Sequence, residues 1–387
     1  MRRIRLAMVG GGRGAFIGGV HRMAARLDDR FELVAGALAS DPQRAMDSAG
    51  DLGIRGYGDF RAMIAAETQR DDGAEAVSIV TPNHMHHAPV LAALAAGLHV
   101  ICDKPLALTV AEAEEITAAA ARAGRVFVLT HNYSGYPMVR QARAMVAANE
   151  IGAIRVVQVE YAQDWLSTKL EDSAQKQAAW RTDPARAGMG GSLGDLGTHA
   201  HHLAEFVTGL RTESVLADVQ SFVEGRRVDD NANLLLRFAG GAPNGARGML
   251  WSSQVAPGNE NALRLRVYGE RGGIAWSQEH PNQLLHTPLN EAPRLLARGA
   301  GALHPAATHA TRIPAGHPEG YLEGFAQLYR DAAEQILAMQ EGRAPDPLST
   351  ATPTAEDGLR GLRFIAAAIA SARAGGAWTA LVPRGLS

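Results

Sequence analysis

The fold of this chain is decided near its start, by residues 4–15, Ile4-Arg5-Leu6-Ala7-Met8-Val9-Gly10-Gly11-Gly12-Arg13-Gly14-Ala15. The apolar run 4–9 predicts a buried strand, and the glycines after it lead into an amphipathic helix predicted at Ala15–Leu27. A strand, a glycine turn and a helix in this order fit the dinucleotide-binding pattern G-x-G-x-x-[G/A]. Gly10 then allows the tight turn, Gly12 lets the backbone approach a pyrophosphate, and small Ala15 permits close packing of helix on strand. The alternative is a tight turn that binds no dinucleotide.

Up to about residue 130, short apolar runs alternate with helical segments. Strands are predicted at Ile4–Val9, Phe31–Leu38, Glu75–Val80, Leu98–Ile101 and Arg125–Leu129. Helices are predicted at Ala15–Leu27, Asp59–Ala66, His86–Ala96 and Thr109–Ala123, the last starting with a Thr109/Glu112 capping box. This alternation is typical of βαβ units around a buried parallel sheet.

The pattern changes after about residue 150. Strands are predicted at Ile154–Trp165, Ser214–Glu224, Ala232–Phe238, Ala246–Val255 and Leu263–Gly269, with few helices between them, which indicates an antiparallel or mixed open sheet. Residues 280–318 carry six prolines and little periodicity, so we expect an irregular segment that is functional or covers a site. Two helices, roughly Glu319–Met339 and Ala355–Arg373, close the chain. Residues 381–387 resemble a protease-cleavage linker and are left out of the fold argument.

The composition is that of an ordinary globular protein. A length of 387 residues with 46% hydrophobic and 20% charged residues predicts two domains. The net charge of −2 gives no reason to expect binding to nucleic acid or to an anionic membrane. One cysteine, Cys102, excludes an internal disulfide and a cysteine-based zinc cluster. Arg2-Arg3 resemble the start of a twin-arginine export signal, but the apolar stretch that follows is short and is better interpreted as a strand. No apolar run approaches the ~18 residues of a membrane span, so we expect a cytoplasmic protein.

The end of the second predicted strand, Ala39-Ser40-Asp41, stands where dinucleotide-binding folds read the adenosine ribose. A carboxylate there accepts hydrogen bonds from both ribose hydroxyls and repels a 2′-phosphate, so Asp41 favours NAD over NADP. Asp41 also precedes Pro42 and can instead cap the next helix, while Arg44 is near enough to serve a phosphate. NAD is the predicted cofactor, and NADP stays open.

Two further turns follow predicted strands, at the carboxyl ends where open α/β sheets bind ligands. In the turn 81–86, Thr-Pro-Asn-His-Met-His, Asn83 and His86 can contact the ribose or the nicotinamide, or simply complete a proline-containing turn. In the turn 102–105, Cys-Asp-Lys-Pro, Lys104 beside a carboxylate suits a group that hydrogen-bonds a substrate hydroxyl, with a solvated lysine as the alternative. Cys102 is interpreted as a small buried residue and not as a nucleophile.

A third motif covers residues 190–202, GGSLGDLGTHAHH. Asp195, His199 and His202 recur at i, i+4 and i+7 and should share one face of a helix. Histidine titrates near neutrality and a carboxylate can hold it, so Asp195 and His199 suit the removal of a proton from an alcohol. A capping or core role is the alternative. Aspartate and histidine at this spacing supply only two metal ligands, so no metal site is predicted.

Together and in this order, the motifs resemble those of the Gfo/Idh/MocA family, named for glucose–fructose oxidoreductase and inositol dehydrogenase. The resemblance rests on the glycine turn, Thr81-Pro82-Asn83, Asp103-Lys104-Pro105 and Gly194-Asp195-x-Gly197-x-His199, and it covers nearly the whole chain. The family's usual glutamate before the lysine is Asp103 here. The resemblance implies oxidation of a hydroxyl-bearing carbon of a sugar, anhydrosugar or polyol with NAD(P). It also implies that His199 is the catalytic base, while Lys104 and Asp195 position the substrate.

The fold implied is α/β, with a Rossmann dinucleotide-binding domain at residues 1–131. Residues 132–387 would form an α+β domain for substrate binding and oligomerisation, with a large, mostly antiparallel open sheet. We expect Lys104 and His199 to converge on one substrate oxygen. We also expect a homo-oligomer, a dimer or a tetramer, formed through the open sheet.

Further segments look like a bacterial sugar-dehydrogenase subgroup that includes levoglucosan dehydrogenase: His131-Asn132-Tyr133, residues 160–165 (EYAQDW), Trp180-Arg181 and residues 316–321 (GHPEGY). Polar and aromatic side chains at strand ends suit a carbohydrate, although each can equally be a core or interface residue. The predicted cofactor-binding residues are Gly10, Gly12, Arg13, Gly14, Ala15, Phe16, Ser40, Asp41, Thr81, Pro82, Asn83, His86, Asp103, Lys104, Trp180 and Arg181. The predicted substrate-binding residues are Lys104, Tyr133, Gln163, Trp165, Asp195, His199 and His317.

Two other functional classes stay open. Enzymes of this kind can use tightly bound NAD in a transient oxidation that cleaves a glycoside. Other relatives keep the fold and act as sensors of a sugar or of NAD. The complete set of Lys104, Asp195 and His199 argues against a sensor.

Overall fold

The computed structural model describes residues 2–173 and 175–382. The predicted linker therefore lies outside the described residues from 383 onward. The chain divides into two compact units, the first formed by Met1–Gly135 with Tyr321–Leu359 and the second by Tyr136–Gly320 with Arg360–Ser387. The prediction gave everything after residue 131 to the second domain, whereas the structure places Tyr321–Leu359 with the first unit. An apolar face of the helix that begins at Tyr321 packs into the core of that unit.

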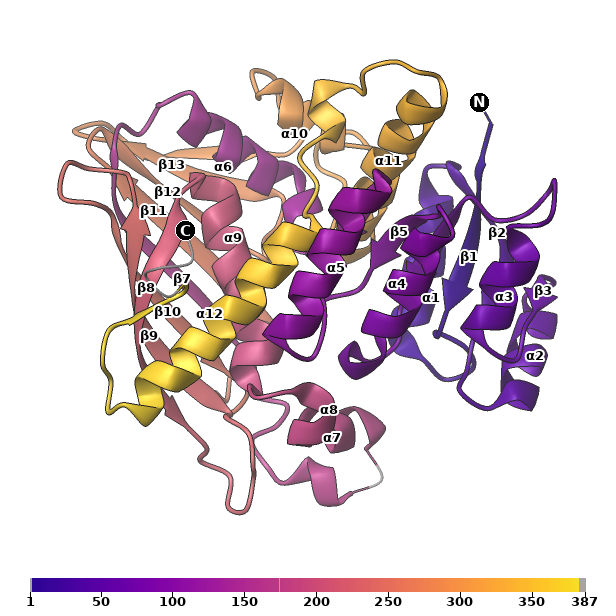
Figure 1. The fold of residues 1–387 in the computed structure, drawn as a ribbon. Coiled ribbons are helices and arrows are strands. Elements are labelled where there is room, and N and C mark those ends of the chain that lie inside the picture. The colour runs from indigo at the N-terminus through magenta and orange to yellow at the C-terminus, as the bar shows by residue number, and fades with distance from the viewer. Residues whose placement is uncertain (1, 174, 383–387) are drawn as a thin grey trace. The chain divides into compact units, whose positions relative to one another are not determined.

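The first unit is built on a six-stranded parallel sheet with the order β3-β2-β1-β4-β5-β6 (Figure 1). Its strands are β1 (Ile4–Val9), β2 (Phe31–Ala37), β3 (Arg55–Gly56), β4 (Ala76–Ile79), β5 (His99–Cys102) and β6 (Phe127–Leu129). The order reverses direction at β1, which places the ends of β1 and β4 side by side. Ligands of open α/β sheets bind at such a switch point.

Helices connect these strands. They are α1 (Phe16–Leu27), α2 (Pro42–Asp51), α3 (Phe60–Glu67), α4 (His87–Ala95) and α5 (Val110–Ala123), joined late in the chain by α11 (Tyr321–Gln340). Helices α3, α4 and α5 pack side by side, and α1 packs against α11. One buried cluster joins Ile4 and Leu6 of β1 with Phe325, Tyr329 and Ile336 of α11. This burial explains why α11 belongs to the first unit.

The second unit contains a nine-stranded sheet with the order β14-β13-β12-β11-β7-β10-β9-β8-β15. Its strands are β7 (Ile154–Ala162), β8 (Arg211–Gln220), β9 (Asn231–Ala239), β10 (Arg247–Ser253), β11 (Ala262–Gly269), β12 (Gly272–Ser277), β13 (Gln283–Pro288), β14 (Arg294–Ala297) and β15 (Thr379–Ala380). Strands β7 and β10 are parallel, and every other pairing is antiparallel. The predicted mostly antiparallel open sheet is confirmed.

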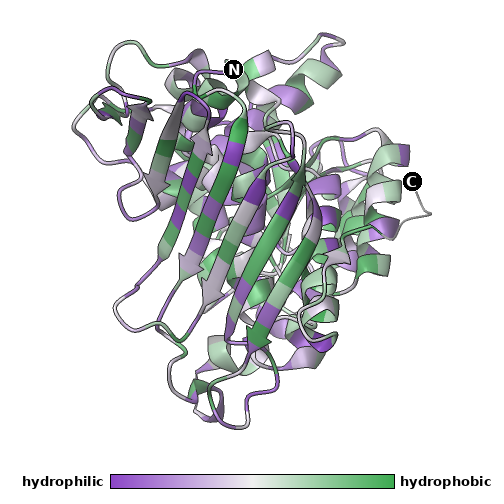
Figure 2. Ribbon diagram, turned by 90° about the vertical axis from the view of Figure 1, so that its left-hand side faces the viewer, coloured by the Kyte–Doolittle hydropathy of each residue, from purple (hydrophilic) through white to green (hydrophobic). Residues whose placement is uncertain are grey.

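The second unit also contains helices, two of which pack on the sheet. The helices are α6 (Pro137–Ala147), α7 (Lys176–Arg181), α8 (Pro184–Ala187), α9 (Thr198–Thr208) and α10 (Pro305–Ala310), with α12 (Ala355–Arg373) contributing its part from Arg360 onward. Helix α9 packs on β7, β10 and β11, and α6 packs on β12 and β13. Figure 2 shows the opposite face uncovered, with hydrophilic and hydrophobic residues mixed along its strands.

The prediction of an irregular segment at 280–318 is wrong. It contains β13, β14 and α10. The prolines that suggested irregularity occupy positions that regular structure tolerates, because Pro288 is the last residue of β13 and Pro305 is the first of α10. Helices α2 and α6 were not predicted, and the predicted strand at Ile154–Trp165 ends at Ala162. Among the described residues, no helix is long and apolar enough to span a membrane.

Candidate active site

The glycine turn joins β1 to α1, and three of its glycines have positive φ: Gly10 (+81°), Gly11 (+77°) and Gly14 (+75°). Gly12 was expected to let the backbone approach a pyrophosphate, but in the structure other parts of the chain occupy the space beside it. A Cβ atom on Gly12 would lie 2.6 Å from the carbonyl oxygen of Leu38 and 2.8 Å from Oγ of Ser48. The missing side chain therefore leaves room for the end of β2 and for α2.

The close packing assigned to Ala15 belongs to Gly18. A Cβ atom on Gly18 would lie 2.3 Å from Cα and 2.4 Å from the carbonyl oxygen of Gly11. Ala15 is instead the N-cap residue of α1, and its N–H donates to the carbonyl of Gly12 (3.0 Å). Contact between the backbones of Gly11 and Gly18 thus seats the turn on the first turn of the helix.

The start of α1 is suited to a phosphate group. No side chain of the described chain caps this helix end, so its first N–H groups point toward the loop, where they attract an anion. The turn borders an open depression of about 440 Å³, lined by Gly12, Arg13, Gly14, Ala15, Phe16, Arg22, Ser48, Asp51 and Leu52. Arg13 pairs with both carboxylate oxygens of Asp51 (Nη2 to Oδ1, 2.6 Å). A glycine turn and an uncapped helix end are the features that a dinucleotide pyrophosphate requires.

The ribose-reading position is shared with a helix cap. Oδ1 of Asp41 accepts a hydrogen bond from the backbone N–H of Arg44 (2.8 Å), so Asp41 caps α2. Nη2 of Arg44 donates to the carbonyl of Arg13 (2.8 Å), which ties α2 to the glycine turn. Ser40 and Asp41 are both exposed just after the end of β2.

His86 connects the two other predicted turns. Its Nδ1 lies 2.8 Å from the carbonyl oxygen of Pro105 and its Nε2 lies 2.7 Å from that of Thr81. The ring is buried, and burial lowers the pKa of this imidazole. His86 was predicted to contact the cofactor, and the structure gives it a bracing role between the two turns. Asn83 is buried beside it, and its Oδ1 accepts from the N–H of His84 (3.0 Å).

The turn after β5 carries Asp103 and Lys104. Asp103 accepts from Oγ1 of Thr130 (2.8 Å), and its backbone N–H donates to the carbonyl of Ile79 (2.9 Å). Lys104 is half-buried and precedes Pro105 through a cis peptide bond. Cys102 is fully buried, and burial raises the pKa of its thiol well above the ordinary value, which agrees with a filler role. Tyr133 is buried in the short turn Asn132–Gly135 of the same unit.

In the second unit, Asp195 and His199 lie on one continuous helical segment. Residues Leu193–Gly197 form a π-helical turn that leads directly into α9. The prediction assumed a regular α-helix, and the wider turn at Asp195 is the difference; such turns are frequent at functional sites. His199 is buried, with its ring 6.0 Å from that of Tyr161.

The neighbouring histidines have structural partners. The ring of His201 stacks on Phe364 at 4.3 Å, and its Nε2 lies 3.3 Å from Oε1 of Glu205. His202 stacks on Phe206 at 5.7 Å. In the part of the chain that the structure describes, no group of three or more His, Cys, Asp or Glu side chains is placed to hold a metal ion.

Asp195 is held by two donors. Nε of Arg181 and Nε2 of Gln254 each lie 3.1 Å from its Oδ2. The guanidinium of Arg181 also sits 4.3 Å from the ring of Trp180 and 5.9 Å from that of Trp165, within cation–π range. Arg181 and Trp180 were predicted to bind the cofactor, and the structure places them around Asp195.

A second polar group lies at the end of β7. Oδ1 of Asn261 accepts hydrogen bonds from Nε2 of Gln163 (2.8 Å) and from the hydroxyl of Tyr161 (2.7 Å). Strands β10 and β11 flank β7 in the sheet. Gln254 follows the last residue of β10 and Asn261 precedes the first residue of β11, so both lie at the same end of the sheet as Gln163. Amide side chains and the hydroxyl of Tyr161 thus lie together at this end of the sheet.

Two buried carboxylates hold the backbone around this site. Asp229 accepts from the N–H groups of Gly191 (2.6 Å) and Leu193 (2.8 Å) and from Oγ of Ser192 (2.6 Å), and so fixes the start of the segment that carries Asp195. Burial raises the pKa of Asp229 against these three donors. The second carboxylate, Asp230, pairs with Arg226.

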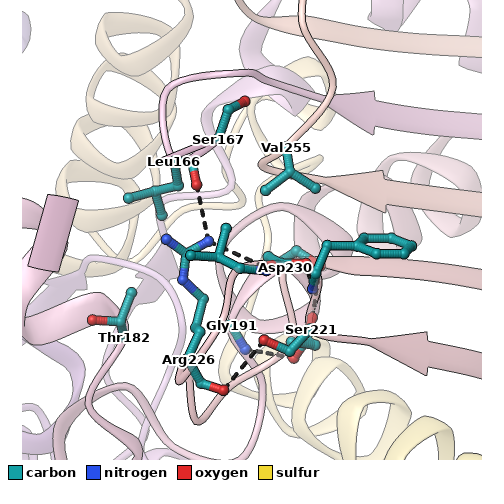
Figure 3. Close-up of polar contacts among 12 residues, drawn as sticks. Leu166, Ser167, Thr182, Gly191, Ser221, Arg226, Asp230 and Val255 are labelled. Carbon is teal, nitrogen blue, oxygen red and sulfur yellow. Dashed lines mark hydrogen bonds and ion pairs between the residues drawn. The ribbon is translucent and has the colours of Figure 1, made fainter. Parts of the chain in front are cut away.

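Arg226 fixes the segment that follows Trp165. Its guanidinium is buried and donates to the carbonyl of Leu166 (2.9 Å), to Asp230 (3.2 Å) and to Glu171 (2.9 Å) (Figure 3). A planar guanidinium with several fixed donors can organise a loop in this way. The loop therefore has a defined path although it contains little regular structure.

A second buried arginine, Arg298, organises the loop that carries His317. It pairs with Glu319 (2.8 Å) and donates to the carbonyls of Ile313 and His317. The side chain of His317 is exposed. Its predicted contact with substrate stays a prediction.

Three residues of this site were not predicted: Gly18, Gln254 and Asn261. Gly18 had a sequence signal, because it opens a second glycine pair only one turn inside the helix. Gln254 and Asn261 lie within or beside predicted strands, yet their proximity to Gln163 depends on strand order. That order is not readable from a single sequence.

Taken together, the glycine turn, the uncapped helix and the switch point define an NAD-binding oxidoreductase. Residues 4–144 match the oxidoreductase family with an NAD-binding Rossmann fold, and residues 139–275 match the GFO/IDH/MocA C-terminal domain. The chain belongs to the Gfo/Idh/MocA oxidoreductase family.

Individual relatives are similar to this chain over most of its length. "Uncharacterized oxidoreductase YfiI" of Bacillus subtilis is 36% identical, over 97% of this chain and 96% of its own length. Levoglucosan dehydrogenase of Pseudarthrobacter phenanthrenivorans is 29% identical over 73% of this chain and 76% of its own. The crystal structure of an inositol dehydrogenase homolog from Azotobacter vinelandii in complex with NAD⁺ is 40% identical, with a TM-score of 0.92 over 98% of this chain and 97% of that one.

Proposed function

We propose that the protein is an NAD-dependent dehydrogenase that oxidises a hydroxyl-bearing carbon of a sugar, anhydrosugar or polyol. The observation that carries the proposal is the carboxylate of Asp195, held by Arg181 and Gln254 beside two tryptophans and on the same helical segment as His199. Neutral polyhydroxylated substrates need such partners, because hydroxyls require hydrogen bonds and C–H faces pack on rings.

The roles of the residues follow from the chemistry of alcohol oxidation. NAD, when bound at the glycine turn and the start of α1, supplies the hydride acceptor. His199 takes the hydroxyl proton, since an imidazole titrates near the working pH. Lys104 donates a hydrogen bond to the same oxygen, and Asp195 accepts one from a substrate hydroxyl. Arg181, paired with Asp195, holds this carboxylate in place.

The test is to incubate purified protein with NAD and a panel of inositols, aldoses, anhydrosugars and glycosides. Net NADH formation with a free polyol or sugar supports the proposal. Cleavage of a glycoside without net NADH points to transient oxidation instead. Binding of a sugar with no turnover of any kind points to a sensor, and both of these outcomes contradict the dehydrogenase.

Cofactor choice provides a specific prediction. We expect a higher kcat/KM with NAD than with NADP, because the charge of Asp41 at the exposed end of β2 repels a 2′-phosphate. Asp41→Ser should narrow this preference while keeping α2 capped, since serine is also a good N-cap residue. Asp59→Ser, at the cap of α3, is the matched control and should leave the preference unchanged. A wild-type preference for NADP would contradict this prediction and show that Ser40 and Arg44, and not Asp41, determine which cofactor is preferred.

We also infer that the uncovered sheet face binds a second copy of the chain. This face exposes Leu235 and Met249 beside a cavity of about 420 Å³, and it carries charges of both signs, Glu160 and Arg264 among them. A twofold partner can match such a mixed surface to itself. Leu235→Lys should shift the mass measured by light scattering toward the monomer, whereas Leu27→Lys on α1 should not. A monomeric wild type contradicts the inference.

A further inference from the structure

A buried chain of polar side chains lies behind the turn that carries Lys104, and the mechanism above does not use it. It consists of Ser78 on β4, Tyr329 on α11, His21 on α1 and Asp103 after β5, all in the first unit. The side chains of His21, Ser78 and Tyr329 are almost completely shielded from solvent. Polar groups in such a place cost stability unless they are bonded, so their arrangement calls for an explanation.

Hydrogen-bonding contacts link these side chains one after another. The hydroxyls of Ser78 and Tyr329 lie 2.8 Å apart, and the Tyr329 hydroxyl lies 2.8 Å from Nδ1 of His21. If Ser78 donates to Tyr329 and Tyr329 donates to Nδ1, the remaining N–H of the imidazole is on Nε2. Nε2 has no hydrogen-bond partner among the described residues, but it lies 3.7 Å from Oδ1 of Asp103.

Aromatic packing fixes the ring in this orientation. Phe325 lies 5.1 Å from the His21 ring, and Tyr329 lies 5.8 Å from it in an edge-on arrangement. The imidazole therefore has one side anchored on α11 and its other nitrogen aimed at the carboxylate next to Lys104. Helix α11 comes from far along the chain, and this contact is one consequence of its membership in the first unit.

We propose that His21 is a positioning residue for the Asp103–Lys104 turn, holding the Asp103 carboxylate so that Lys104 keeps its place in the reaction. The proposal rests on the function proposed above. Asp103 and Lys104 are neighbours in one short turn, whose backbone is also tied to Ile79 and whose carboxylate is tied to Thr130. Fixing Asp103 from inside the unit thus fixes the backbone that carries Lys104.

The charges around Asp103 agree with this role. Burial raises the pKa of Asp103, but the imidazole of His21 and the charges of Lys104 and His86 together lower it to about 2. The groups that face Asp103 are His21 from α1, Tyr329 from α11, Cys102 at the end of β5, His86 from the neighbouring turn, and Lys104 and Thr130. Without the imidazole, burial has less opposition and the pKa of Asp103 rises.

The decisive variant is His21→Leu, which removes both ring nitrogens and keeps an apolar side chain to pack against Phe325. We expect kcat to fall roughly 10- to 100-fold, the size of loss that a small misplacement of a catalytic group produces. KM for NAD should stay near the wild-type value. A loss of kcat with KM for NAD unchanged is not what a merely destabilised protein would show.

Two milder variants test whether a loss of kcat comes from the removed contacts or from misfolding. His21→Gln should recover part of the lost kcat, because its amide N–H can still donate toward Asp103. Tyr329→Phe should give an intermediate loss, since it removes only the hydroxyl that anchors Nδ1. The matched control is His99→Leu, another buried histidine of the first unit, whose Nδ1 accepts from the N–H of Val126 (3.0 Å). It should lower Tm and leave kcat per folded molecule near the wild-type value.

A readout without substrate separates this proposal from the proposed function. The folded pKa of Asp103, about 2, lies below its ordinary 3.8, so its ionisation stabilises the fold above about pH 4 and ceases to do so as pH falls toward 2. His21→Leu raises that pKa, so less stability is lost on acidification, and Tm should fall less steeply from pH 4 to pH 2 than in the wild type.

Wild-type protein that oxidises nothing in the panel contradicts the proposed function, and the Tm measurement then decides the link between His21 and Asp103 alone. His21→Leu with the kcat of the wild type and the pH dependence of Tm of the wild type below pH 4 would overturn the proposal. A loss of kcat of equal size in His99→Leu would overturn it as well.

Discussion

Replacing His199 with alanine should lower kcat by roughly 10²- to 10⁴-fold, the usual contribution of a positioned acid–base group. Hydride can leave a carbinol carbon only as its hydroxyl proton is removed, and His199 is the residue to which we assign that proton. NADH affinity should stay near normal, because the glycine turn belongs to the first unit and His199 to the second. Turnover with the best substrate of the panel and NADH titration by fluorescence measure the two quantities.

The control lies one turn further along the same helix. His202→Ala removes another buried imidazole, one that stacks on Phe206, and should lower Tm while kcat per folded molecule stays near the wild type. A purely structural His199 predicts the same behaviour for both variants. Near-wild-type kcat in a stable His199→Ala protein would therefore remove this residue from the mechanism.

Lys104→Ala should be at least as damaging as His199→Ala and should also weaken substrate binding. If the two side chains act on the same oxygen, their effects are not independent, and the double variant should lose little more than the worse single variant. Multiplied losses in the double variant would show that Lys104 and His199 assist separate steps.

The second large effect is expected at the glycine turn. Gly18→Ala places a methyl group 2.3 Å from Cα of Gly11, and both contacting groups are backbone, so the turn itself must move. Overpacking by a methyl group costs about 1–3 kcal/mol, and here the displaced atoms include those that meet the cofactor. NADH affinity should fall roughly 10- to 100-fold, together with a lower Tm.

The neighbouring Gly19 supplies the matched control. A Cβ atom on Gly19 meets only Nη2 of Arg22, at 4.0 Å, and alanine is favoured over glycine inside a helix by about 1 kcal/mol. Gly19→Ala should therefore keep NADH affinity and raise Tm slightly. Equal losses in both variants would mean that the Gly11–Gly18 contact does not control the turn.

The sequence by itself determined the features that depend on neighbours along the chain. The period of apolar residues predicted β1 and α12 with the bounds that the structure has. The capping box of Thr109 and Glu112 begins α5, as predicted, because caps are made within one helical turn. The helix ends at the predicted residue, Ala123, and is followed by the left-handed Gly124. Motif spacing predicted the family for the same reason, since each motif occupies a single short stretch of the chain.

Tertiary structure alone decided the features that depend on register and packing between distant segments. Gly18 and not Ala15 carries the close contact, because the path of the turn determines which residue faces Gly11. Helix α11 belongs to the first unit because its apolar face fits the core around β1, which its own periodicity cannot specify. Gln254 meets Asp195 because the π-helical turn Leu193–Gly197 packs against β10. His21 meets Asp103 because α1 packs in the core of the first unit, where α11 fixes the orientation of its ring. Such encounters are set by the free energy of packing the whole unit, so no local pattern in the chain encodes them.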